Sequence, residues 1–83
     1  MTDKEFEILD ELYFVISYRE LMESLGWEEE SLIHELSNLF DKGWIRVFED
    51  PDNTQDFESI NSEILQKSFL LASKAGLKAH NSQ

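Results

Sequence analysis

The sequence contains no cysteine, so no disulfide bond and no thiolate metal site can stabilise it. It also lacks an apolar run of the roughly 18 residues needed to cross a bilayer. The N-terminal residues do not show the basic and then apolar order of a signal peptide. These absences predict a cytoplasmic protein that depends on its hydrophobic core for stability.

Glycine is scarce, and the three glycines are isolated residues at expected helix boundaries. They do not form a phosphate-binding loop. No motif for a nucleophilic triad is present, and a solvated acidic surface explains the many carboxylates. We therefore expect no catalytic residues, no cofactor and no enzymatic activity. The 83 residues, of which 41% are hydrophobic, suffice for one ordered domain over residues 1–83.

Basic side chains are few: 7 Lys and Arg residues face 18 acidic residues, which gives a net charge of −11. A field of this sign repels nucleic acid and anionic membranes. The acids are concentrated before residue 64, whereas the chain from Ile64 onwards carries lysines and no acid. This polarity favours either a solvated surface or a contact between the basic end of one copy and an acidic patch of another.

Two amphipathic helices are expected in the first third of the chain. The spacing of Phe6, Leu9, Tyr13 and Ile16, a stripe that Ile8 and Leu12 widen, predicts a helix over about residues 3–14, followed by a short extended segment. Ser17 and Glu20 match a capping box, which predicts that a second helix begins there. That helix would end at Gly26, the residue best able to adopt the left-handed conformation.

A third helix is expected to begin near the acidic residues 28–30 and to end at residues 42–43. Its apolar arc consists of Leu32, Ile33, Leu36, Leu39 and Phe40. Its outward face would present Glu30, Ser31, His34, Ser37, Asn38 and Asp41. Glu30 and His34 stand four residues apart, but two ligands are too few for a closed metal site, so we expect no metal.

The remainder of the chain suggests a wing and a last helix. Residues 44–48 and 68–72 read as two strands, and residues 49–53 have the composition of a turn. Ser73 would cap a short helix over residues 74–80, and residues 80–83 would fray. The connection at about residues 49–67 would be an elongated wing or a short helix. Its apolar side chains would be covered by the domain itself or by a second protomer: Phe57, Ile60, Ile64 and Leu65.

Three segments together resemble winged helix-turn-helix domains of prokaryotic transcription regulators: residues 17–27, residues 32–45 with their Lys-Gly-Trp-Ile step, and residues 69–76. The resemblance covers about residues 5–80. It implies an α+β, mainly helical fold with a three-helix core, a two-stranded wing and a short C-terminal helix. It also implies that the third helix would enter the DNA major groove.

If the resemblance extends to DNA binding, the Asn38 side chain would hydrogen-bond adenine, and His34 would donate to a phosphate or a base edge. The candidates for phosphate contact are Arg19, Lys42 and Arg46. The helix face itself carries no Arg or Lys, and residues 49–63 hold six acids and no base. Such a surface forfeits the counterion release that supplies most non-specific DNA affinity.

Three functions remain open. The first is a non-catalytic winged-helix regulatory module that binds protein, itself or a partner, through the acidic third helix and wing. The second is a DNA-binding regulator in which dimerisation joins Lys67, Lys74 and Lys78 with Arg19 and Arg46 into a basic stripe. The third is a DNA mimic with carboxylates at phosphate-like spacing. The composition favours the protein-binding module.

Overall fold

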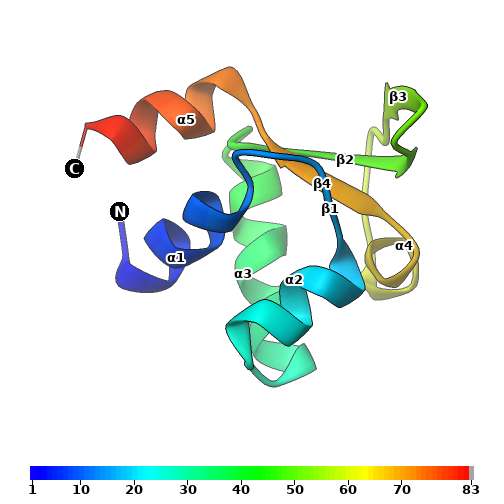
Figure 1. Ribbon diagram of the computed structural model, residues 1–83, viewed down its shortest axis with the longest axis horizontal. Coiled ribbons are helices and arrows are strands. Elements are labelled where there is room, and N and C mark those ends of the chain that lie inside the picture. Colours follow the sequence, from blue (N-terminus) through cyan, green and yellow to red (C-terminus); the bar gives the residue numbers. More distant parts are fainter. Residues whose placement is uncertain (83) are drawn as a thin grey trace.

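The computed structural model describes residues 1–82, apart from the side chain of Thr54. It contains five helices and a small sheet packed into a body of 30 × 26 × 20 Å (Figure 1). The elements are, in chain order, α1 (Asp3–Glu11), β1 (Ile16–Ser17), α2 (Tyr18–Leu25), α3 (Glu29–Asp41), β2 (Ile45–Asp50), β3 (Asn53–Asp56), α4 (Ser62–Gln66), β4 (Phe69–Ala72) and α5 (Lys74–Asn81).

The helix boundaries follow from capping chemistry. The Ser17 hydroxyl accepts from the backbone N–H of Glu20 at 3.1 Å, as predicted, and α2 ends at Gly26 with a φ of 69°. Ser73 caps α5 in the same way. The Glu20 side chain accepts from the Ser17 hydroxyl, so only the serine half of the predicted capping box is observed at the start of α2. A complete capping box, between Thr2 and Glu5, starts α1 and was not foreseen from the sequence.

The sheet has four antiparallel strands in the order β1-β4-β2-β3. β4 pairs with β2 from Ile45↔Ala72 to Phe48↔Phe69, which confirms the two predicted strands. The strand β3 was missed because its four residues are polar and show no apolar alternation. It lies at the edge of the sheet and pairs with β2 alone, across an irregularity in register after Phe48.

The core lies between α1, α2, α3 and the inner face of the sheet. Its fully buried side chains include Ile8, Leu9, Leu12, Leu21, Leu32, Leu36, Leu39, Val47, Leu65 and Leu70. The arc of α3 therefore matches the prediction at Leu32, Leu36 and Leu39. The predicted stripe of α1 is confirmed at Ile8, Leu9 and Leu12, which are fully buried, whereas Phe6 and Tyr13 at its edge remain 38% and 39% exposed.

The prediction that residues 80–83 fray is wrong for residues 80 and 81. The helix α5 continues to Asn81, and the His80 ring stacks on Phe6 with 4.2 Å between ring centroids. The Tyr13 hydroxyl donates to Asn81 Oδ1 at 2.6 Å and lies 2.8 Å from His80 Nδ1. These contacts, between residues distant in sequence, fix the last turn of α5 against α1. Gln83 lies outside the described residues.

The segment after the wing turn is covered by its own domain. It contains the short helix α4, one of the two conformations expected, instead of an elongated wing. Leu65 is fully buried, so it is not available to a second protomer. Phe57 and Ile60 pack against the core and Ile64 is half-buried. The spacing of these side chains identified an apolar face, but not the core that covers it.

Candidate recognition face of helix α3

The outer face of α3 is the candidate site, because α2 and α3 form the helix-turn-helix pair. Glu30, His34, Asn38 and Asp41 are exposed along it, and Ser31 and Ser37 are half-buried. The structure thus brings the predicted residues onto one helix surface. The left-handed Gly26 makes the turn that sets α3 across α2 (Figure 1).

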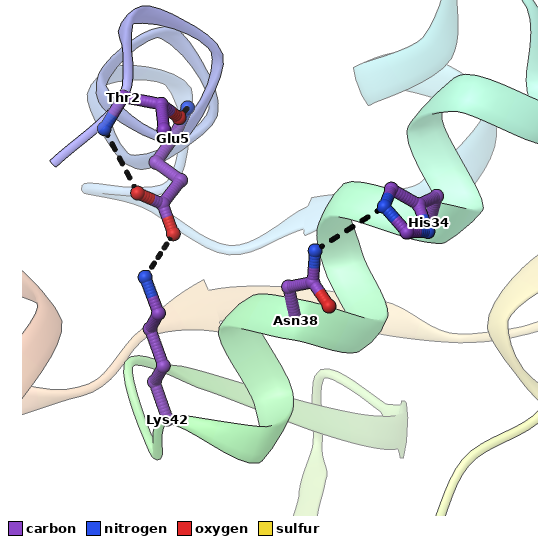
Figure 2. A network of polar contacts seen from close by, with 5 residues as sticks. All are labelled: Thr2, Glu5, His34, Asn38 and Lys42. Atoms are coloured by element: carbon purple, nitrogen blue, oxygen red, sulfur yellow. Dashed lines mark hydrogen bonds and ion pairs between the residues drawn. The ribbon is translucent and has the colours of Figure 1, made fainter.

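His34 and Asn38 are neighbours on this face. Asn38 Nδ2 lies 3.5 Å from His34 Nε2, at the outer limit of a hydrogen bond (Figure 2). The four-residue spacing places the two side chains one helical turn apart. Both remain exposed, so both have polar atoms that a partner molecule can reach.

Lys42 follows Asn38 by one more turn, but its charge is directed to α1. Its Nζ atom lies 2.5 Å from Glu5 Oε2 (Figure 2) and 4.6 Å from the centre of the Trp44 ring. Glu5 is only 3% exposed. Burial opposes its ionisation, yet the hydrogen bonds from Lys42 and from Thr2 outweigh burial and lower its pKa. Lys42 is therefore engaged as the partner of a buried carboxylate.

Arg46, the cation of the wing, is paired as well. Its guanidinium binds both carboxylate oxygens of Asp56 on the neighbouring strand, with Nε–Oδ2 and Nη2–Oδ1 distances of 3.2 and 2.9 Å. The guanidinium also lies 5.5 Å from the centre of the Phe48 ring. The bidentate contact joins β2 to β3 and neutralises the positive charge that a DNA-binding wing would offer to phosphate.

The third candidate cation, Arg19, lies exposed at the start of α2. It lines a hollow of about 170 Å³ together with Tyr18, Met22, Glu29 and Gln66. These residues come from three helices, α2, α3 and α4. The hollow therefore depends on the position of α4, and no sequence motif predicts this hollow.

A second hollow adjoins the first, because Glu29 and Gln66 line both. It measures about 460 Å³, and its other lining residues are Glu30, Ile33 and Ser62. The Gln66 amide donates to the Glu29 carboxylate between α4 and α3. We call the two hollows together the α3–α4 groove.

Tyr18 lines the smaller hollow of this groove and is 4% exposed. Its hydroxyl has no hydrogen-bond partner among the residues that the structure describes. Burial raises its pKa, and the nearby charge of Glu29 raises it further, so the hydroxyl keeps its proton at neutral pH. A buried hydroxyl without a hydrogen-bond partner lowers the stability of a fold, and such groups are rare in native structures.

The described helices include none long and apolar enough to span a membrane. Within residues 1–82, no three His, Asp or Glu side chains are grouped so that they could hold a metal ion.

The helix-turn-helix pair α2–α3, the preceding helix α1 and the antiparallel strands behind them form a winged helix-turn-helix domain, as the sequence resemblance implied. The structure is similar to that of the Multiple Antibiotic Resistance Repressor, MarR, with a TM-score of 0.77 and 18% sequence identity over 99% of this chain and 53% of that chain. No protein-family model matches the sequence, and no curated protein matches it.

Two crystal structures of a cysteine-to-serine mutant of MarR from E. coli are also similar. The mutant complexed with operator DNA gives a TM-score of 0.74, and the mutant alone gives 0.75. Both are 18% identical in sequence over 99% of this chain, and the matches extend over 52% and 54% of the two mutant chains. The chain thus spans about half the length of the MarR chains, and at this identity the similarity establishes the fold.

Proposed function

We propose that this chain is a non-catalytic winged-helix module of transcription regulation. The observation that carries the proposal is the match of nearly the whole chain to the fold of MarR, whose described role is that of a repressor. The exposed polar residues of α3 lie on the helix that such domains use for recognition. The proposal concerns the module only, since half of each MarR chain lies outside the match.

Between the two modes of action, the comparisons favour DNA contact. One of the similar structures is a complex with operator DNA. In this mode, His34 and Asn38 would face base edges, and a second copy or another protein would bring cations to the phosphates. Because Lys42 and Arg46 are paired with carboxylates, this mode requires positive charge from outside the α3 face.

For a single copy, the charges of the structure favour the other mode, contact with a basic protein surface. The α3 face presents Glu30 and Asp41, and α3 begins with Glu29 and Glu30. The net charge of −11 adds a long-range field that attracts positive surfaces and repels phosphate. We therefore propose protein contact as the mode of the isolated chain.

Titration of the ¹⁵N-labelled chain with a mixed pool of duplex DNA at low salt separates the two modes, with its mass in solution recorded in the same buffer. Protein contact by a single copy implies no perturbation of the α3 amides. Perturbation of His34 and Asn38 that disappears steeply as salt rises would establish DNA contact instead.

A further inference from the structure

We propose that the α3–α4 groove binds an arginine or lysine side chain of a basic partner segment. This inference rests on the protein-contact mode proposed above and specifies where that contact is made. It comes from the chemistry of the lining residues and from the hydroxyl of Tyr18, one of those residues, which is buried and unpartnered within the described chain.

The wider part of the groove suits a side chain with an aliphatic stem and a cationic head. Ile33 provides an apolar contact for the stem. Glu29 and Glu30 provide carboxylates for the head, and Ser62 and Gln66 add neutral oxygen acceptors. A guanidinium group has several donors in a plane and can use carboxylate and amide oxygens together.

The narrower part supplies the second observation. Tyr18 lines it with a hydroxyl that is buried and has no partner among the described residues. A tyrosine hydroxyl both donates and accepts, so a polar group bound beside Tyr18 would satisfy it. An acidic surface alone would attract cations without fixing their position, whereas an unpartnered hydroxyl among the lining residues favours one bound position.

Anionic ligands fit less well. Arg19 lines the narrow part, but Glu29 lines it as well, and the wide part has two carboxylates and no cation. The surrounding field of the chain is negative. A carboxylate or phosphate would therefore meet more repulsion than attraction along the groove.

The test is a titration of the ¹⁵N-labelled chain with a short blocked peptide that has one central arginine between alanines. The expected result is a set of chemical-shift changes centred on Tyr18, Glu29, Ile33 and the side-chain amide of Gln66. The same peptide with citrulline in place of arginine keeps the shape and removes the charge, and it should not shift these signals.

The variant Glu29→Gln/Glu30→Gln should weaken binding of the arginine peptide about fivefold or more, as expected for partly exposed charged contacts. The control Glu7→Gln/Glu23→Gln removes the same charge from exposed positions outside the groove and the α3 face, and it should leave binding within about twofold. Shifts centred on His34 and Asp41 would overturn the groove while leaving the protein-contact mode intact. Equal weakening by both variants would also overturn it, because binding would then follow total charge.

If the peptide causes no shifts anywhere, the groove proposal is overturned. DNA-induced shifts at His34 would separately overturn the protein-contact mode.

Discussion

The Lys42 ammonium lies 2.5 Å from the buried carboxylate of Glu5 and so joins the end of α3 to the first turn of α1. Glu5 also accepts from the backbone N–H of Thr2 at 2.9 Å, which completes the capping box of α1. One carboxylate thus caps a helix and fixes the far end of the candidate recognition helix. It also removes a positive charge from the surface where DNA would be expected.

We expect Glu5→Gln to lower the free energy of unfolding by about 1–2 kcal/mol, because it weakens a cap and leaves the Lys42 charge without its partner. Urea unfolding at neutral pH measures this change. Glu58→Gln, at an exposed position, is the control and should change stability by less than about 0.5 kcal/mol. Equal stability of Glu5→Gln and the parent chain would show that the pair is incidental.

The same carboxylate predicts a dependence on pH. The pKa of Glu5 is lower in the folded chain than its ordinary value of 4.5, so ionised Glu5 stabilises the fold above that pH. This contribution should be lost as the pH falls below 4.5 and through the folded pKa. The loss of melting temperature on acidification should therefore be smaller for Glu5→Gln than for the parent chain. Parallel curves for the two proteins would contradict this assignment.

Gly76 allows α5 to pack against the backbone that enters β2. A Cβ atom at this position would lie 2.0 Å from the carbonyl oxygen of Trp44. We expect Gly76→Ala to destabilise the fold by about 1–3 kcal/mol, because the clash exceeds the gain in helix propensity. Thermal unfolding of Gly76→Ala beside Ala75→Ser, a change at an exposed neighbour, measures the difference. An increase in stability for Gly76→Ala would mean that α5 does not approach Trp44 so closely.

The Tyr13 hydroxyl holds the last turn of α5 through His80 and Asn81. Tyr13→Phe should cost about 0.5–1.5 kcal/mol and should speed amide hydrogen exchange in α5 more than in α3. Phe14→Leu is the matched control, since Phe14 is 82% exposed and its ring contributes little to the core. Unchanged exchange in α5 would contradict a role for this hydroxyl.

Reversal of the acidic charges on α3 tests whether the geometry of this face is compatible with binding to duplex DNA. Glu30→Lys/Asp41→Lys places two cations beside His34 and Asn38, and we expect it to create salt-sensitive binding to duplex DNA. Glu7→Lys/Glu11→Lys makes the same change in net charge on α1 and should bind much less. Similar DNA binding by both variants would mean that net charge, and not the α3 face, governs the contact.

Local signals in the sequence identified most of the helices and two of the strands. Ser17, Gly26 and Ser73 mark helix boundaries through capping chemistry that acts over a few residues, and the structure has those boundaries. The polar strand β3 has no such signal, because its place depends on pairing with β2. His80 was misplaced for a similar reason: its order comes from Phe6 and Tyr13, more than sixty residues earlier.

The outward face of α3 could be predicted, since helical periodicity alone places Glu30, His34 and Asn38 together. The pairing of Lys42 with Glu5 and of Arg46 with Asp56 could not, because each pair joins different elements. The α3–α4 groove was missed for the same reason, since Tyr18 and Gln66 meet only in the folded chain.

We propose that the α3 face of a single copy contacts a basic protein surface and not DNA. The most direct measurement is the low-salt titration of the ¹⁵N-labelled chain with mixed duplex DNA, followed at the amides of His34 and Asn38 while the mass in solution is monitored. We expect that the α3 signals of a single copy do not shift. Salt-sensitive shifts on α3 of the monomer would contradict the claim and identify the chain as a DNA-binding regulator.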